Sequence, residues 1–355
     1  MTGETIKGRG AGENTANRYQ SLQIVYDQED AILGDDETPS PRTRFYQDKA
    51  KSLITENESP DVAARFGINA YRGCEHGCAY CFARPSHEYL GFSAGLDFET
   101  KIMVKGEAPE LMRKQLMNPK WQGDPIMISG NTDCYQPVER KLQITRRMLQ
   151  VAQEFGQPIG VITKNALVRR DIDIFQKMLR TQSIQVYVSI TTLDDRLSGL
   201  IEPRASRPRL RLEAVKALSD AGVPVGVMVA PVIPGLNDED VPSVLEAAKA
   251  AGARHATWTL LRLAKPLDTL FEDWLRRHLP DRAEKVLSRI RDTRGGALND
   301  TRFGVRMRGH GVYAEQLRSL FQVSARRHGL DQRMPPLETR HFARPEPPTK
   351  QLSLF

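Results

Sequence analysis

Short apolar runs alternate with longer segments of helical spacing over most of this chain, and this alternation restricts the folds that it can adopt. Six runs are bounded by glycine, proline or polar residues, as is typical of buried strands: FGINAY, PIMISG, PIGVIT, IQVYVSI, VPVGVMVAPVI and HATWTLLRL. The segments between them have the apolar spacing of helices: 107–118, 137–155, 168–181, 208–221 and 239–251. Strands that alternate with helices predict a parallel sheet of strand–helix units.

Six strand–helix units can close into a partial (β/α)6 barrel of the TIM type, which is the α/β fold that we expect. An open doubly wound sheet is the alternative. Two further helical segments, 267–294 and 312–329, lie outside the alternation. We expect an irregular extension, a barrel core, a basic helical region and a flexible proline-rich tail, with bounds of 1–60, 61–265, 266–333 and 334–355.

The composition of the 355 residues, with 40% hydrophobic and 27% charged, is that of a soluble globular protein. No apolar run is long enough to span a membrane, and the N-terminus lacks the apolar stretch of a signal peptide. Four cysteines are too few for a disulfide scaffold in a chain of this length. We therefore expect a cytoplasmic protein without a membrane partner, whose cysteines take part in chemistry.

The net charge of +7 is unevenly distributed. Residues 275–355 contain 17 Lys and Arg against 8 Asp and Glu, whereas residues 1–274 contain 34 against 36. A localised positive surface attracts polyanions, of which nucleic acid is the obvious one. An arginine-rich solvated helix face is the alternative interpretation.

Cys74, Cys78 and Cys81 form a CxxxCxxC loop directly after the first expected strand. Thiolates select soft metals and iron–sulfur clusters, and a short loop lets three of them face one inorganic centre. A closed zinc site requires a fourth ligand, for which His76 lies inside the loop and Cys134 is 53 residues further on. A four-iron cluster held by three cysteines instead leaves one iron open to a substrate or cofactor.

The segment YRGCEHGCAYCFAR, with Tyr80 before the last cysteine, resembles the cluster loop of the radical S-adenosylmethionine (radical SAM) superfamily. The resemblance spans about residues 65–265 and implies a barrel of the radical SAM type, a [4Fe-4S] cluster on the three cysteines and S-adenosyl-L-methionine as cofactor beside Tyr80. In that superfamily the open iron binds the methionine part of the cofactor, and an electron from the cluster yields a 5′-deoxyadenosyl radical that abstracts a hydrogen atom. An unidentified electron donor is then a further partner.

The resemblance also implies cofactor-binding residues at the carboxyl ends of the strands, where barrel enzymes bind their ligands. The residues after the second strand either match the loop that meets the cofactor's amino group or form an ordinary Asn/Asp turn. These residues are Ser129, Asn131, Thr132 and Asp133. Those after the later strands are Lys164, Ser189, Glu202, Arg204, Ile233 and Gly235. Glu202 and Arg204 either bind the ribose hydroxyls and carboxylate or pair with each other. Ile233 and Gly235 match an adenine-contacting stretch, for which a Pro-Gly turn is the alternative.

Within the superfamily, ISGNTDCYQPVER, ITKNALVRRDIDI and IEPRASRPRLRLEAVKAL resemble the spore photoproduct lyase-like group, also called DNA repair photolyase-like. In the lyase, a cysteine just before the Ser/Thr-Asp pair donates a hydrogen atom during reversal of a thymine dimer. This chain has Gly130 at that position and Cys134 after Asp133. Cys134 is thus a relocated hydrogen donor, a radical relay with Tyr135, or a small buried residue. Thymine-dimer reversal is therefore not transferred to this chain.

The last five residues, Gln351, Leu352, Ser353, Leu354 and Phe355, resemble the short motif by which bacterial DNA polymerases and repair proteins bind the sliding clamp. A proline-rich tether presents a glutamine and apolar side chains that fill a pocket, and packing back onto the core is the alternative. With the basic last quarter, this motif favours a radical SAM enzyme that acts on DNA, in repair and with lyase-like chemistry. The alternatives are a radical SAM enzyme that modifies RNA and a zinc-stabilised nucleic-acid-binding module without catalysis.

Overall fold

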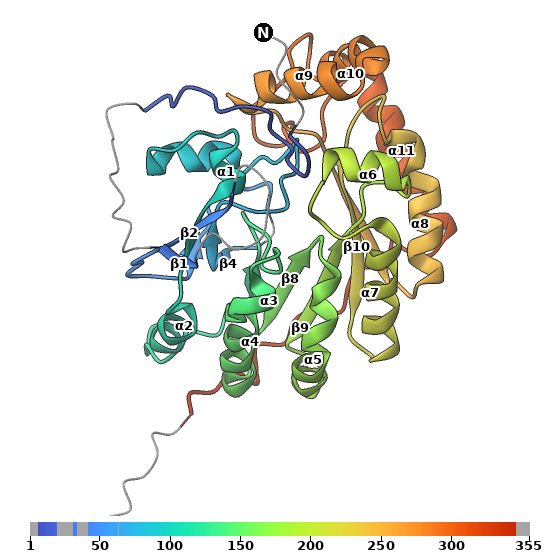
Figure 1. The fold of residues 1–355 in the computed structure, drawn as a ribbon. Helices are drawn as coiled ribbons and strands as arrows, with labels where there is room; N and C mark the ends of the chain where they lie inside the picture. Colours follow the sequence, from blue (N-terminus) through green and yellow to red (C-terminus); the bar gives the residue numbers. More distant parts are fainter. Residues whose placement is uncertain (1–5, 20–30, 34–41, 63, 346–355) are drawn as a thin grey trace, which may run out of the picture.

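The structure, a computed structural model, describes residues 6–19, 31–33, 42–62 and 64–345 (Figure 1). The six expected strands are all present in these ranges: β4 (Phe66–Ile68), β7 (Ile126–Ile128), β8 (Ile159–Thr163), β9 (Ile184–Ser189), β10 (Val225–Val232) and β11 (His255–Leu260). They are parallel and lie in chain order, with the short β3 (Thr55–Glu56) antiparallel beside β4. A doubly wound sheet would reverse its strand order at a switch point. The unbroken order confirms the partial barrel instead.

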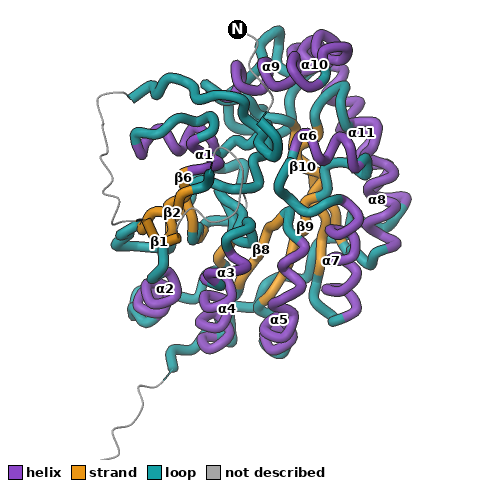
Figure 2. The backbone as a smooth tube through the Cα atoms, viewed as in Figure 1, coloured by secondary structure: helices purple, strands orange, loops and turns teal. Residues whose placement is uncertain are grey.

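Helices follow the strands and lie along the outside of the curved sheet (Figure 2). They are α2 (Ala108–Leu116), α3 (Glu139–Leu142), α4 (Ile144–Phe155), α5 (Ile172–Leu179), α6 (Asp195–Ile201), α7 (Pro208–Asp220) and α8 (Val241–Ala250). Their apolar faces are buried, as with Met148, Leu149 and Ala152 of α4, whose exposed fraction is 0%. This burial fixes the strands, and therefore the positions of the loops at their carboxyl ends.

Local backbone chemistry divides two of the expected helices. The segment 137–155 is broken between α3 and α4 at Gln143, whose φ of 50° is left-handed and cannot continue a helix. The segment 267–294 becomes α9 (Leu267–His278) and α10 (Pro280–Asp292), because Pro280 has no amide hydrogen to bond to the preceding turn and instead begins a new helix.

The last helix, α11 (Val312–Arg327), packs beside α8. Its Phe321 stacks on Trp258 of β11, with 5.8 Å between the ring centroids. Helices α9 and α10 lie above the barrel in Figure 1 and bury apolar side chains of their own, such as Phe271 and Trp274. None of the helices in the described ranges is long and apolar enough to cross a membrane.

A small second sheet was not expected from the sequence. In the described residues it has the order β1 (Ala31–Leu33), β2 (Arg44–Gln47), β6 (Lys101–Val104) and β5 (Tyr71–Arg72). A short helix, α1 (Asp97–Thr100), leads into β6. These strands are too short to display a repeating pattern, and two of them come from the N-terminal region that was expected to be irregular. Its strand β5 ends two residues before Cys74, so the sheet holds the start of the cysteine loop.

The described part of the proline-rich tail has no helix or strand, but it is attached to the core. Ala343 donates its backbone amide to the Phe155 carbonyl at 2.9 Å, and Arg344 donates to the Trp121 carbonyl at 2.6 Å. The expected flexible tail therefore lies, up to residue 345, along the end of α4 that is farthest from α9 (Figure 1). The expected clamp-binding residues 351–355 lie outside the described residues.

Candidate cluster and cofactor site

The cysteine loop lies at the carboxyl end of β4, between α1 and α6. The backbone amide of Cys74 donates to the Phe98 carbonyl at 2.9 Å, and that of Ala79 donates to the Ile201 carbonyl at 2.9 Å. Cys74 and Cys78 are buried, and Cys81 is half-buried. The loop is therefore anchored at both sides, with its three thiols largely removed from solvent.

Glycine is needed at one turn of this loop. Gly73 has a φ of +80°, and a Cβ at that position would lie 2.9 Å from the Phe98 carbonyl oxygen. The backbone therefore approaches α1 more closely than any side chain would permit. This close approach places Cys74 beside Phe98 and the half-buried Cys81.

The donor set fits a cluster with three protein ligands better than a closed zinc site. His76, the expected fourth zinc ligand, already uses both ring nitrogens: Nδ1 lies 3.4 Å from the Asp133 carboxylate and Nε2 lies 3.2 Å from the Asn165 amide. Burial lowers the pKa of His76 to about 4, so its ring is neutral. Among the described residues, no group of three or more histidine, cysteine, aspartate and glutamate side chains is arranged so that it could hold a single metal ion. Three thiols without a fourth ligand suit a [4Fe-4S] cluster.

The N-terminal residues 6–19, which we call the strap, cross the cysteine loop and are dark blue in Figure 1. The amides of Gly10 and Ala11 donate to the buried carboxylate of Glu99 at 3.1 and 2.8 Å. The same carboxylate pairs with buried Arg84, which follows the last cysteine of the loop. The strap therefore covers the cysteine loop and is held by the same carboxylate as the residues beside the thiols.

A methyl group on Gly10 is expected to lift the strap. Its Cβ would lie 1.7 Å from the Gly77 carbonyl oxygen, a backbone atom that cannot move aside. We expect Gly10→Ala to lower the unfolding midpoint by about 5 °C and to speed the loss of iron during desalting. Gly106→Ala is the matched control, because a Cβ there meets nothing within 4 Å. Equal midpoints and equal iron retention in the two variants would contradict this role of the strap.

The loop after β7 is locked by its own polar groups. Asp133 accepts hydrogen bonds from the Thr163 hydroxyl and the Lys164 amide, both at 2.7 Å. The Thr132 hydroxyl donates to the Tyr71 carbonyl at 2.8 Å, and the Ser129 hydroxyl accepts from the Cys134 amide at 2.7 Å. The Asn/Asp turn with local bonds is thus present. Asp133 links this loop to the end of β8 and, through His76, to the cysteine loop.

Asn131 and Ser129 keep positions that a ligand can reach. Asn131 is exposed, and its backbone amide donates to the Asn69 side-chain oxygen at 2.8 Å. Ser129 is half-buried in a left-handed conformation, with φ of 78°. Thr132 is buried and the Asp133 carboxylate is engaged by four partners, so these two residues position the loop. The assignment of all four to the cofactor stays a prediction.

A buried ion pair lies beside the cysteine loop. The Tyr80 hydroxyl donates to one oxygen of Glu202, and the Arg211 guanidinium donates to the other. Arg211 also donates to the Ser189 carbonyl at 3.0 Å, so the fourth strand is tied to the same group. Burial by itself lowers the pKa of Lys164, but Cys78 and Glu202 raise it above its usual value, so Lys164 is a cation next to this pair.

The expected alternative pairing of Glu202 with Arg204 is wrong. Arg204 instead forms an ion pair with Glu75 of the cysteine loop, at 3.1 Å. Its backbone amide donates to the His76 carbonyl at 3.2 Å. Both members of the expected pair therefore hold the cysteine loop, Glu202 through Tyr80 and Arg204 through Glu75, and their contact with the cofactor stays a prediction.

The loop after β10 is closed by hydrogen bonds and by α10. Ile233 is buried, and its amide donates to the Asn237 side chain at 2.6 Å. Gly235 has a φ of +76°, and its carbonyl accepts from Arg282 of α10 at 3.1 Å. A Pro-Gly turn is therefore present, and the contact of these two residues with adenine stays a prediction.

Cys134 and Tyr135 lie in a buried polar network under the barrel mouth. The Tyr135 hydroxyl donates to Asp171 at 3.0 Å, and Arg170 pairs with Asp171 at 2.9 Å. Cys134 is only 2% exposed, and its carbonyl accepts from the Thr145 hydroxyl at 2.7 Å. Cys134 packs in the main apolar core of the barrel, whereas the three loop thiols belong to two smaller apolar clusters. A catalytic role for Cys134 and Tyr135 stays a prediction.

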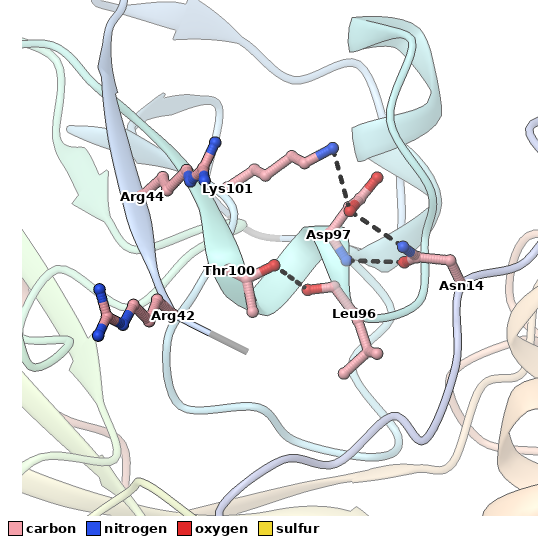
Figure 3. Close-up of a pocket in the computed structure, with 7 residues that line it drawn as sticks. All are labelled: Asn14, Arg42, Arg44, Leu96, Asp97, Thr100 and Lys101. Carbon is pink, nitrogen blue, oxygen red and sulfur yellow. Dashed lines mark hydrogen bonds and ion pairs between the residues drawn. The ribbon is translucent and has the colours of Figure 1, made fainter. Parts of the chain in front are cut away.

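A shallow hollow of about 380 Å³ lies beside α1, at the edge of the small sheet (Figure 3). It is lined by Asn14, Arg42, Arg44, Leu96, Asp97, Thr100 and Lys101. In Figure 3 the Asp97 carboxylate is held between Asn14 and Lys101, at 3.1 and 3.3 Å. None of the residues that the sequence singled out lines this hollow, so it is distinct from the cysteine loop.

Comparison with known proteins agrees with this geometry. Residues 68–248 match the family model described as the Radical SAM superfamily. An uncharacterised protein of Mycobacterium tuberculosis is 35% identical over 253 residues, which cover 70% of this chain and 73% of the relative. An uncharacterised protein of Methanocaldococcus jannaschii is 30% identical over 190 residues, covering 54% of this chain and 68% of the relative. Spore photoproduct lyase complexed with dinucleoside spore photoproduct has a TM-score of 0.53 at 15% identity, over 80% of this chain and 79% of that one.

A partial barrel that carries three thiols in one loop at its mouth, two of them buried and one half-buried, defines a class of iron–sulfur enzymes. The chain belongs to the radical SAM superfamily. The cofactors of this superfamily are the [4Fe-4S] cluster and S-adenosyl-L-methionine, in agreement with the expectation from the cysteine loop. The likeness to spore photoproduct lyase shows a shared fold.

Proposed function

We propose that this radical SAM enzyme acts on DNA, in repair and with lyase-like chemistry. The observation that carries the proposal is where the positive charge lies. Residues 275–311 contain ten Lys and Arg against four Asp and Glu, and this segment covers the carboxyl ends of β10 and β11. A polyanionic substrate would therefore be drawn to the same end of the barrel as the cysteine loop.

The chain's own residues hold and shield the reaction centre. When bound, the cluster and S-adenosyl-L-methionine supply a carbon radical that abstracts hydrogen. Cys74, Cys78 and Cys81 would ligate the cluster. Glu202 and Arg211 fix Tyr80 beside it, and the strap covers the loop through its bonds to Glu99. Placement and exclusion of water are the tasks that a protein performs for a cofactor of this kind.

The comparisons support a DNA substrate by likeness. A spore photoproduct lyase complexed with a dinucleoside lesion shares the fold. A Radical SAM Nalpha-GlyT isomerase of Pseudomonas phage M6 is 22% identical over 277 residues, which cover 77% of this chain and 55% of that enzyme. The non-catalytic zinc module that the sequence left open is disfavoured, because His76 has no free ring nitrogen to serve as a ligand.

The test is a cofactor-cleavage assay on enzyme reconstituted without oxygen. Pools of deuterated damaged DNA and deuterated RNA are supplied separately with a chemical reductant in place of the unidentified electron donor. We expect deuterium to enter 5′-deoxyadenosine with the DNA pool. Incorporation from RNA only would overturn the DNA assignment in favour of RNA modification.

Cys134→Ala is expected to retain iron at the wild-type level and to lower turnover on the substrate pool. The first expectation follows because Cys134 packs in the main apolar core and the loop thiols in other clusters, and the second follows from the proposed role as hydrogen donor. Iron is measured colorimetrically, and turnover is measured as product per 5′-deoxyadenosine formed. Loss of iron would make Cys134 a ligand, and unchanged turnover would make it a small core residue.

The tail residues 351–355 are proposed to bind a sliding clamp. The proposal rests on their sequence, since they lie outside the described residues. Deletion of Gln351 to Phe355 is expected to abolish binding to immobilised purified clamp while leaving cofactor cleavage unchanged. An unchanged affinity for the clamp would show that the motif has no such role.

A further inference from the structure

We infer that Phe82, Arg262 and Phe303 form a subsite at the barrel mouth that binds an unpaired stretch of DNA, with Arg262 on a phosphate and the two rings against bases. This inference rests on the proposed function, which it deepens by naming the surface and the form of the substrate. It is carried by the contacts among these side chains, their exposure and the charge around Arg262.

The first half of the subsite joins the cysteine loop to the last strand of the barrel. Phe82 directly follows Cys81, and its exposed fraction is 48% although it is a large apolar side chain. Arg262 lies two residues beyond the end of β11, and its guanidinium carbon is 5.6 Å from the centre of the Phe82 ring. An exposed ring and a guanidinium therefore lie together at the carboxyl end of the barrel, next to a cluster thiol.

The second half comes from the loop that connects α10 to α11. Phe303 is 60% exposed, and the Arg306 guanidinium carbon lies 4.4 Å from the centre of its ring. Arg262 reaches this loop through Met307, whose sulfur accepts a hydrogen bond from Arg262 at 3.5 Å. The two aromatic–arginine pairs are thus neighbours along one surface rather than separate features.

The loop is held firmly enough to present these side chains. Buried Arg294 donates to the carbonyls of Leu261 and Val305, at 2.6 and 3.1 Å. Asp61 accepts from the Gly304 amide at 2.7 Å and pairs with Arg306 at 2.5 Å. Because these contacts fix the backbone directly after Phe303, its exposure is a property of an ordered loop.

The charges around Arg262 are not balanced. Arg306 has Asp61 as its counter-ion, but Arg262 forms no ion pair in the described part of the chain. Burial and the neighbouring Arg306 lower the pKa of Arg262, whereas Asp61 raises it to a smaller extent. A half-buried guanidinium that faces a second one is stabilised by an anion, and a phosphodiester provides it without a second carboxylate from the protein.

Exposed rings next to arginines match the chemistry of unpaired nucleotides. Every base has a face that stacks on an aromatic ring, and every nucleotide carries a phosphate that a guanidinium binds. A paired base inside a duplex cannot offer its face to Phe82, so the strand must be unpaired or the base turned out of the helix. An acidic peptide would use the arginines but would leave both rings exposed.

The experiment measures binding of a short fluorescein-labelled oligothymidylate to reconstituted full-length protein by fluorescence anisotropy at several salt concentrations. Phe82→Ala, Arg262→Gln and Phe303→Ala are each expected to weaken binding about tenfold. Arg262→Gln should also reduce the salt slope by about 0.7, since one phosphate contact is lost. Arg65→Gln is the matched control. Its arginine also stacks on a ring, Phe66, at 4.9 Å, but lies at the amino end of β4.

The outcomes separate the subsite from the proposed function. Wild-type protein that binds neither oligothymidylate nor duplex DNA would overturn both. If the wild type binds and all three variants bind with the same affinity, only the subsite is overturned. The same holds if Arg65→Gln loses as much affinity as the three variants do. Iron content is measured for every variant. Should Phe82→Ala lose iron through its neighbour Cys81, Phe303→Ala, which is remote from the thiols in sequence, still decides the question. If the wild type binds oligouridylate more tightly than oligothymidylate, and the variants weaken the binding of both equally, the assignment to DNA is overturned.

Discussion

Replacing any one of Cys74, Cys78 and Cys81 by alanine is expected to reduce the iron content of the reconstituted protein from about four atoms per chain to background. The three thiols come from one loop, and neither His76 nor Cys134 is placed to replace a missing thiol as a ligand. His76 uses both ring nitrogens, and Cys134 lies in the barrel core. Cleavage of S-adenosyl-L-methionine should therefore fall to the level measured without protein.

Cys134→Ala is the matched control for these variants, because it removes a buried thiol without removing a ligand. Iron and sulfide analysis, the visible absorption spectrum and 5′-deoxyadenosine formation are compared across all four variants. If a loop variant kept the full iron content and cleaved the cofactor, the cysteine that it lacks would not be a ligand of the cluster. Circular dichroism separates loss of the cluster from loss of the fold.

The barrel could be predicted from the sequence because the residue pattern that specifies each strand or helix lies within that element. Runs such as PIGVIT and IQVYVSI are mostly apolar without strict alternation, as is typical of strands buried on both faces, and β8 and β9 fall within them. Strand order could also be inferred, because each strand is followed by a helix. The second sheet could not, since β5 and β6 are held by pairing with residues far along the chain.

The candidate site shows the same division between local and distant information. The spacing of three cysteines within one loop is visible in the sequence. The partners of Glu202 and Arg204 are not, because Arg211 and Glu75 become their neighbours only when the chain folds. The strap was missed for the same reason. Its glycine-rich segment resembles an ordinary turn until Gly77 is found packed on Gly10.

Arg211→Met is expected to destabilise the protein by about 3–5 kcal/mol, because it leaves the carboxylate of Glu202 buried without its counter-ion. Both side chains are almost fully buried, with exposed fractions of 1%. Glu202→Gln should cost a similar amount by leaving Arg211 unpaired. The double variant should be less destabilised than the sum of the two, since neither isolated charge remains. Strict additivity would show that the pair does not act as a unit.

The pH dependence provides a second test of this pair. Burial by itself raises the pKa of Glu202, but Arg211 and Lys164 more than offset it, and the folded-state pKa lies below the usual value. A lowered carboxyl pKa stabilises the folded state above the unfolded-state value of about 4.3 and loses that effect as the pH falls through the folded-state value. The difference in unfolding midpoint between wild type and Glu202→Gln should therefore be constant between about pH 8 and pH 6 and should shrink below about pH 4. A difference that grew on acidification would mean that Glu202 is protonated in the folded protein, and its hydrogen bond with Tyr80 would then have to be assigned in the opposite direction.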